Sequence, residues 1–323
     1  MELRHLQAFL AVVDHGSFSA AAEALGTVQS NVSAQVARLE RELGATLLER
    51  SGGRLTTEGQ VVLERARRVL SEVEALVADL GALREELAGT VRAGMIGTLA
   101  RWVVPALLAD LGARHPKLQL VVAEGTSATL EGPLLTGRLD FALLSHPLPS
   151  RDLRLEPLLA EALLFVSPLD QDPFPGAEHL TMAELAQVPL LLPPPGSAFR
   201  VELDAAAAAA GVALRARAEL DGLRLIASLV FDGHGAAVLP ASAIPQYLQG
   251  RVRARPVEGL PSRTVGVALR RRGLPSAPAR AVIQAVERLA RRAEALPPGL
   301  QPIEPEVLRR AEGSLRTLGV PND

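Results

Sequence analysis

The chain has 323 residues, of which 48% are hydrophobic, a formal net charge of -2 and no cysteine. This length and apolar content predict two or three packed domains and argue against disorder. The lack of cysteine excludes disulfides, thiol catalysis and cysteine-ligated metals. The amino terminus has no basic segment before an apolar run, and no apolar stretch is long enough to span a membrane. We therefore expect a cytoplasmic protein without membrane partners.

The first 40 residues predict three helices. The first helix carries an apolar stripe formed by Leu3, Leu6, Phe9, Leu10 and Val13. Ser17 is placed to cap the second helix, whose inner face consists of Phe18, Ala21, Ala22 and Leu25. Gly26 and Thr27 break the pattern, and the third helix follows with inward-facing Val32, Val36 and Leu39. Two helices joined by such a short turn predict a helix-turn-helix unit.

The outer side of the third predicted helix is polar, with side chains that can bond base edges and phosphates. The candidate DNA-binding residues on it are Gln29, Ser30, Asn31, Ser33, Gln35 and Arg38. Residues 1–60 hold five arginines against seven acidic residues. This charge balance counts against DNA binding, because phosphate neutralisation supplies most non-specific affinity.

A two-stranded wing is predicted after the third helix. Gly52 and Gly53 force a turn after the apolar pair Leu47 and Leu48, and Arg50 and Arg54 flank that turn. An arginine at the tip of a wing suits insertion into a minor groove beside the recognition helix. The alternative is a surface hairpin with two solvated arginines.

A long helix is predicted from Gln60 to about Ala88, where Gly81 is the only helix-breaking residue. Apolar residues recur there at alternating steps of three and four, the spacing of a coiled-coil seam. The seam consists of Leu63, Ala66, Leu70, Val73, Val77 and Leu80. A helix of this length spans about 40 Å. Its narrow apolar stripe predicts pairing with a second copy, and a helix folded back on its own domain is the alternative.

The first 90 residues resemble the LysR-type transcriptional regulator family. The resemblance rests on the pattern AAEALxxxQSNVSxxVxRLExELGxxLLER, the arginine-flanked turn followed by LTTEG, and the long helix. One departure is Val28, which stands where the family usually has Ser or Thr before the Gln that opens the recognition helix. This departure leaves the capping role to Thr27.

From Val91 onward, short apolar runs alternate with amphipathic helices, which predicts an α/β fold. Strands are expected at 91–98, 118–125, 139–145, 163–168, 188–193, 213–218, 235–240 and 264–272, and helices at 99–114, 129–136, 198–210, 222–231 and 278–295. The elements form two similar units. They fit the two-lobed, periplasmic-binding-protein-like sensor domain that the family resemblance implies.

The predicted domains follow from these elements. They are a winged helix-turn-helix domain at 1–58, a linker and dimerisation helix at 59–89, an effector-binding domain at 90–296 and a C-terminal extension at 297–323. Within the effector-binding domain, lobe I covers about 90–163 and 266–296, and lobe II about 164–265. Proline-rich joints around one short amphipathic helix predict a partly disordered extension.

Ligands of two-lobed α/β sensors lie between the lobes, at the carboxyl ends of strands and the amino ends of helices. Residues in that position of the sequence are the candidate effector-binding residues, namely Thr98, Ser127, Ala128, Thr129, Ser197, Phe199, Arg200 and His234. Hydroxyl groups at helix amino termini suit an anion such as a small carboxylate. The alternative is that Thr98 and Ser197 only cap helices and that the glycines near His234 only serve tight turns.

Catalytic and cofactor motifs are absent from the sequence. The six histidines are scattered without metal-ligand spacing, and neither a phosphate-binding loop nor a GxSxG motif occurs. We therefore expect no enzyme activity, metal or cofactor.

The leading hypothesis is a DNA-binding transcriptional regulator, a homodimer or homotetramer on double-stranded DNA, whose sensor binds a small-molecule effector. Contact with the transcription machinery is part of this hypothesis. The alternative is a small-molecule binding protein or enzyme of the binding-protein fold, with a degenerate helix-turn-helix used for association. The polar face of the third helix favours the regulator, because association alone would not require it.

Overall fold

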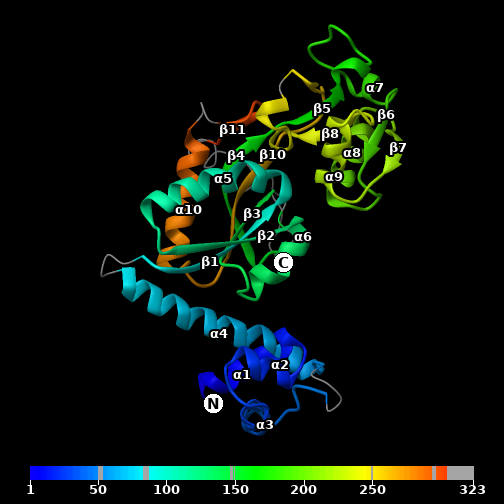
Figure 1. Ribbon diagram of the computed structural model, residues 1–323. Helices are drawn as coiled ribbons and strands as arrows, with labels where there is room; N and C mark the ends of the chain where they lie inside the picture. Colours follow the sequence, from blue (N-terminus) through cyan, green and yellow to red (C-terminus); the bar gives the residue numbers. More distant parts are fainter. Residues whose placement is uncertain are drawn as a thin grey trace, which may run out of the picture.

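A computed structural model describes residues 1–49, 54–82, 87–145, 148, 150–248, 250–292 and 296–303. A small helical domain at the amino terminus is joined by one long helix to two α/β lobes that follow each other in space (Figure 1). No helix in the described ranges has the length and apolar character needed to cross a membrane.

The helical domain consists of α1 (Leu3–His15), α2 (Phe18–Ala24) and α3 (Gln29–Leu43). Ser17 caps α2 as predicted, since its hydroxyl accepts a hydrogen bond from the Ala20 amide at 3.1 Å. The apolar positions read from the sequence form the core, in which Phe9, Ala21 and Leu39 are fully buried. The helix-turn-helix prediction is confirmed.

The start of α3 differs from the expectation. Val28 occupies the N-cap position and provides no side-chain hydrogen bond. Thr27 does not cap the helix either, because its hydroxyl accepts a hydrogen bond from the Asn31 side-chain amide at 2.9 Å. Thr27 lies one residue before the N-cap, so its hydroxyl reaches a side chain one turn along the helix instead of a backbone amide. The Gln29 and Ser30 amides at the start of α3 are therefore open to an external acceptor, whereas the Asn31 amide donates to the Val28 carbonyl at 3.0 Å.

The base of the wing is held to α3 by one carboxylate. Leu48 and Leu55 pair in an antiparallel bridge, and the Glu49 amide donates to the Arg54 carbonyl at 2.8 Å. The Glu40 carboxylate accepts hydrogen bonds from the Leu47 amide at 2.7 Å and the Leu48 amide at 3.3 Å. The wing therefore starts at a fixed distance from α3. Its predicted tip, including Arg50, lies outside the described residues.

The apolar seam of the long helix α4 (Thr57–Ala82) lies partly in the core of the helical domain and partly at the surface. Leu63 and Ala66 are buried in the core of the helical domain, and Leu70 packs against that core. Farther along, Val73, Val77 and Leu80 are exposed. The dimerisation prediction is corrected for Leu63 and Ala66, because the core of their own chain already covers them. Only the second half of the seam is open to a partner.

Lobe I is built on a six-stranded sheet with the order β11-β4-β10-β3-β1-β2. Its strands are β1 (Gly89–Ile96), β2 (Leu118–Gly125), β3 (Phe141–Ser145), β4 (Leu153–Glu161), β10 (Arg263–Arg270) and β11 (Leu300–Pro302), and its helices are α5 (Gly97–Arg114), α6 (Ser127–Leu135) and α10 (Ala277–Arg291). Strands β2 and β3 flank β1 in parallel. Right-handed crossovers therefore place α5 and α6 on opposite faces, and a crevice opens at the carboxyl end of β1.

Lobe II contains two small sheets, with the orders β8-β5-β9 and β6-β7, joined by the bridge between Leu190 and Ala236. Its strands are β5 (Leu163–Pro168), β6 (Pro189–Leu192), β7 (Arg215–Glu219), β8 (Ala237–Pro240) and β9 (Val252–Pro256). Its helices are α7 (Met182–Leu185), α8 (Ala198–Ala209), α9 (Leu223–Phe231) and the short 3-10 turns η1 (Leu169–Gln171), η2 (Ala241–Ala243) and η3 (Gln246–Leu248).

Three strands were not predicted from the sequence, namely β4, β9 and β11. Strand β11 corrects the expectation that the C-terminal extension is only appended to the sensor. It pairs antiparallel with β4, and Leu300 is buried. Residues 304–323 lie outside the described residues. The chain thus uses the start of its extension to complete the sheet of lobe I.

Polar contacts fasten α4 to lobe I. The Asp79 carboxylate accepts from the Ala277 amide at 2.5 Å, at the start of α10, and lies 3.5 Å from Arg280. Glu74 lies 3.6 Å from Arg92 on β1. These contacts place α4 across lobe I beneath α10 and β1, as Figure 1 also shows. A displacement of lobe I would therefore be transmitted to α4.

Replacing either of two helical glycines by alanine is expected to change the stability of the protein, in opposite directions at the two sites. A Cβ at Gly59 in α4 would lie 2.0 Å from the Leu47 carbonyl oxygen, whereas a Cβ at Gly112 in α5 would meet nothing within 4 Å. We expect Gly59→Ala to destabilise the helical domain by about 1–3 kcal/mol, because backbone must move. Gly112→Ala is the control and should stabilise by about 0.5–1 kcal/mol. Thermal melting by circular dichroism measures both. A midpoint raised by Gly59→Ala would contradict the close approach of α4 to the wing.

Candidate nucleic-acid interface and ligand cleft

The outer face of α3 carries the polar residues named from the sequence. Gln29, Ser30, Asn31, Ser33 and Arg38 are exposed and Gln35 is partly exposed. The inner residues of the same helix, Val32, Val36 and Leu39, are buried. Arg54, at the described end of the wing, is also exposed. The structure thus brings one polar helix face and one wing arginine to the surface of the same domain.

Side-chain hydrogen bonds order part of this face before any ligand is present. Asn31 donates to Thr27, and Gln35 donates to the Asn31 carbonyl oxygen at 3.0 Å, which links three residues one turn apart. Ser19 of α2 donates to the Gln29 side chain at 3.2 Å. Within the described residues, Ser30 and Ser33 make no side-chain hydrogen bonds. The serines are therefore free to bond an incoming acceptor, while Asn31 and Gln35 are held in one orientation.

A cavity of about 370 Å³ lies between the lobes. Lobe I contributes the amino terminus of α5 and the end of β2, and lobe II contributes α9 and η2. The lining residues are Gly97, Thr98, Arg101, Glu124, Arg224, Leu225, Ala227, Ser228 and Ala243. Of the eight candidate effector residues, Thr98 lines this cavity. The remaining seven do not.

The residues at the start of α6 bond to each other instead of to the cavity. Thr126, which is not one of the predicted residues, caps the helix, and the Thr129 hydroxyl accepts from the Thr126 amide at 2.8 Å. Ser127 and Ala128 occupy the first turn of the same helix. Because α5 and α6 lie on opposite faces of the sheet, only the amino terminus of α5 faces the cavity. The expectation for Ser127, Ala128 and Thr129 is corrected accordingly.

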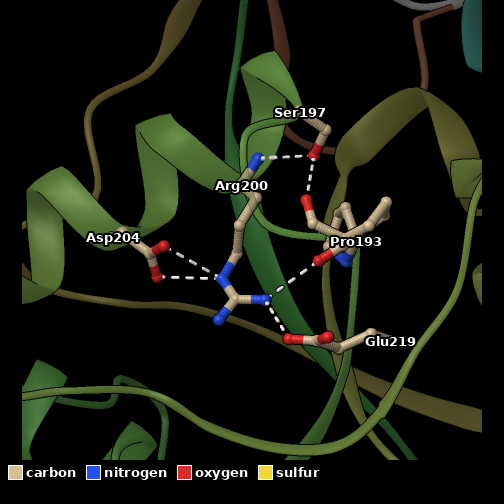
Figure 2. Close-up of polar contacts among 6 residues, drawn as sticks. Pro193, Ser197, Arg200, Asp204 and Glu219 are labelled. Carbon is tan, nitrogen blue, oxygen red and sulfur yellow. Dashed lines mark hydrogen bonds and ion pairs between the residues drawn. The ribbon is translucent and has the colours of Figure 1, made fainter.

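The residues at the start of α8 form a closed local network (Figure 2). The Arg200 side chain is 12% exposed and donates to Asp204, Glu219 and the Pro193 carbonyl, each at 3.0 Å. The Ser197 hydroxyl donates to the Pro194 carbonyl at 2.9 Å and accepts from the Arg200 amide. Most of the polar groups of Arg200 and Ser197 are thus used within lobe II, and neither residue lines the interlobe cavity. Ser197 caps α8 and Arg200 ties α8 to Glu219 of β7, so the expectation that they bind an effector is corrected and both are structural residues of lobe II.

Phe199 and His234 are also away from the cavity. Phe199 packs against the core of lobe II, with the Arg263 guanidinium 5.8 Å from the ring centroid. His234 is exposed in the turn after α9, where its amide donates to the Leu229 carbonyl at 2.8 Å. The prediction fails for these two residues because strand order, which the sequence did not reveal, turns the start of α8 and the end of α9 away from the interlobe cavity.

A buried ion pair joins the strands that cross between the lobes. Glu161 ends β4 and Arg263 begins β10, and their side chains meet at 2.7 Å with almost no exposure. The second carboxylate oxygen of Glu161 accepts from the Ser242 amide at 2.9 Å. Burial raises the pKa of nearby Glu202. This ion pair holds β4 and β10 together where the chain passes between the lobes.

Sequence reasoning missed the charged groups of the cavity. Glu124 of β2 and Arg224 of α9 form an ion pair across the cleft. Arg101 donates to the Tyr247 hydroxyl and lies 5.6 Å from its ring centroid. Glu124 is the penultimate residue of the strand predicted at 118–125, whereas the candidates named near this strand were Ser127, Ala128 and Thr129, which follow its end. No three histidine, aspartate or glutamate side chains are grouped as metal ligands in the described ranges.

A winged helix-turn-helix on a long helix, followed by two lobes around a cavity, defines a ligand-responsive DNA-binding protein. Residues 3–60 match the family model described as bacterial regulatory helix-turn-helix protein, lysR family, and residues 84–291 match the LysR substrate binding domain. The chain belongs to the LysR family and is a DNA-binding transcriptional regulator with an effector-binding domain.

Relatives and solved structures agree with this assignment. The chain is 34% identical over 274 residues to a probable hydrogen peroxide-inducible genes activator of Streptomyces viridosporus, covering 83% of this chain and 88% of that protein. It is similar to full-length OxyR of Pseudomonas aeruginosa carrying a cysteine-to-aspartate substitution, with a TM-score of 0.74, 27% identity and coverage of 94% and 99%. CbnR in complex with its target DNA gives a TM-score of 0.64, 25% identity and coverage of 90% and 100%.

Replacing Arg200 tests whether it is a structural or a ligand-binding residue. We expect Arg200→Ala to destabilise lobe II by ~2 kcal/mol, because Asp204 and Glu219 lose their shared partner. Hydrogen exchange should accelerate in α8 and β7 and stay unchanged at the start of α5. Arg215→Ala is the control, since Arg215 is an exposed arginine of β7 with one 3.5 Å hydrogen bond. Altered exchange at residues 97–101 with α8 intact would place Arg200 at the cleft instead.

Proposed function

We propose that this regulator reads DNA through α3 and the wing, and that a small molecule bound between the lobes controls this contact. The observation that carries the proposal is the combination of an exposed polar face on α3 with an interlobe cavity at the uncapped start of α5. Family membership supports this function and not the alternative of a binding protein or enzyme with a degenerate helix-turn-helix.

The base-reading residues in this proposal are Gln29, Ser30, Asn31, Ser33 and Gln35. Arg38 and the wing residues Arg50 and Arg54 contact phosphates or the minor groove. The low positive charge of the domain makes local placement decisive, because few cations are available for phosphate neutralisation. The open amides at the start of α3 add an uncharged means of bonding a phosphate.

We propose that two copies pair through the exposed second half of the α4 seam, formed by Val73, Val77 and Leu80. These residues, with the exposed Val69 and Leu76 beside them, cover only about three helical turns, which is short for a coiled coil. Further contacts between copies, such as those of a dimer of dimers, would then add to the interface. The paired heads would bind half-sites at a fixed spacing. The domain limits proposed for this arrangement are 1–58, 59–89 and 90–296, with the extension from 297.

The effector in this proposal is a bound molecule with a carboxylate. The relatives are named hydrogen peroxide-inducible activators, and peroxide acts on proteins chiefly by oxidising cysteine thiolates. This chain has no cysteine, and of its three methionines Met95 and Met182 are buried. Thr98 and the start of α5 instead offer non-covalent groups for an anion.

The signal would pass from the cleft to DNA through α4. Ligand binding would stabilise one spacing between the two lobes relative to the spacing without ligand, which is a population shift. Lobe I carries that change to α4 through Asp79 and Glu74, and α4 carries it to the helical domain, whose core contains Leu63 and Ala66. The distance between paired recognition helices would change as a result.

Two substitutions on the DNA-binding face should have different effects. We expect Gln29→Ala to relax sequence preference, with a cost of about 1–3 kcal/mol on the preferred site only, because it removes a base contact. Arg54→Ala should weaken binding to all sequences alike and reduce the salt slope by about 1, because it removes a phosphate contact. Fluorescence anisotropy on specific and random DNA at several salt concentrations measures both. Arg114→Ala, at an exposed arginine of α5, is the control, and an exchange of the two effects would contradict the assignment.

Peroxide treatment tests the proposed mode of sensing. We expect excess hydrogen peroxide to leave the affinity of the protein for its own promoter DNA unchanged, because no thiol is present to oxidise. Binding is compared before and after treatment, with catalase-quenched peroxide as the control. A peroxide-dependent change in affinity would show that the chain responds to oxidation by another route.

A further inference from the structure

Five polar side chains from both lobes line the interlobe cavity, and three of them, Thr98, Glu124 and Arg224, lie around the start of α5. Thr98 lies in the first turn of α5, Glu124 near the end of β2, and Arg224 in the first turn of α9. Glu124 and Arg224 form an ion pair across the cleft. Both side chains remain accessible, at 42% and 63%. A molecule that enters the cavity therefore meets an ion pair that it can open.

The Glu124 carboxylate lies at the amino terminus of α5. A Cβ placed on Gly97 would be 2.4 Å from the Glu124 Oε1 atom and 2.9 Å from the Arg224 Cδ atom. Gly97 is the first residue of α5, and its N-cap residue, Ile96, offers no side-chain hydrogen bond. The open amides and the helix dipole favour an anion at this point. The chain thus places its own carboxylate where an anionic ligand would bind.

The Thr98 hydroxyl is a second, independent indication of a ligand. Thr98 is only 4% exposed, and it lines the cavity. Its hydroxyl makes no hydrogen bond within the described part of the chain. In the described part of the chain, the fully buried side-chain atoms without a hydrogen bond are in Ser242 and Arg263, so the Thr98 hydroxyl itself keeps access to the cavity and can bond a ligand there. The geometry leaves the partner to be supplied from the cavity.

We infer that the effector is a zwitterion of the α-amino acid class, an inference that rests on the proposed function. Its carboxylate takes the place of the Glu124 carboxylate beside Arg224, Thr98 and the start of α5. Its ammonium group then pairs with the displaced Glu124. One ion pair across the cleft is replaced by two, and neither protein charge is left without a partner.

Ligands with a single charge fit this site less well. A simple carboxylate would compete for Arg224 and leave Glu124 unpaired beside a second anion, which is unfavourable. A simple amine would pair with Glu124 but leave Arg224 unpaired, next to Arg101 and the positive end of α5. The remaining wall of the cavity is apolar or small, with Leu225, Ala227 and Ala243. Together with a volume of about 370 Å³, this wall suits an amino acid of modest size.

Calorimetry on the full chain tests the inference. The standard amino acids are screened, and the strongest binder is compared with its deaminated acid and its decarboxylated amine. We expect the amino acid to bind at least ~10-fold more tightly than either analogue. In Glu124→Gln the preference over the deaminated acid should fall below about threefold, because the group that discriminates is gone. Arg224→Gln should weaken the amino acid and the acid alike.

Glu156→Gln is the matched control. Glu156 pairs with Arg154 on β4, outside the cavity, and its side chain is 42% exposed, as is that of Glu124. This variant should keep the wild-type preference. Wild-type protein that binds no amino acid, or that binds the deaminated acid equally well, overturns the inference. DNA binding of the same preparation is measured in parallel, so a failed proposed function is recognised by lost DNA affinity, whatever the calorimetric result.

Discussion

The burial of Leu63 and Ala66 in the helical domain is the constraint on which the rest of the molecule depends. It makes α4 part of the DNA-binding head at one end, while Asp79 binds the same helix to α10 at the other. The Glu40 carboxylate adds the wing to this unit. The recognition helix α3, the wing and α4 therefore move as one unit. Lobe I is the part of the sensor that can displace this unit, because it contacts α4.

In the sensor, the polar groups that are available to a ligand lie where α5 of lobe I and α9 of lobe II begin. The amino termini of α5 and α9 meet at the cavity, and neither has a side-chain cap. Elsewhere in the same domain the helix starts are satisfied internally, by Thr126 in α6 and by Ser197 in α8. The contrast between capped and uncapped helix starts separates residues that build the fold from residues that remain available to a ligand.

Periodicity was sufficient to predict the helical domain, the long helix and the main strands of the sensor, because each buries one regular face. It failed for β9, whose sequence VRARP has no continuous apolar run, and for β11, which has three residues. The cleft was harder to predict. Helix-start reasoning placed Thr98 correctly in the wall and misplaced Ser197 and Arg200, because strand order decides which helix starts face each other. Glu124 and Arg224 are 100 residues apart, so only the folded chain brings them together.

The carboxyl end of the β4 edge of lobe I, at residues 159–161, is covered by β11, and the Gly299 carbonyl also accepts from the Ala162 amide at 2.8 Å. An uncovered strand of this length would offer a row of unpaired amides and carbonyls to the nearest extended chain. A fragment that ends before residue 299 would thus expose a template for edge-to-edge aggregation. Sensor fragments of this protein for crystallisation should therefore extend past residue 291, where the match to the LysR substrate binding domain ends, through Ile303.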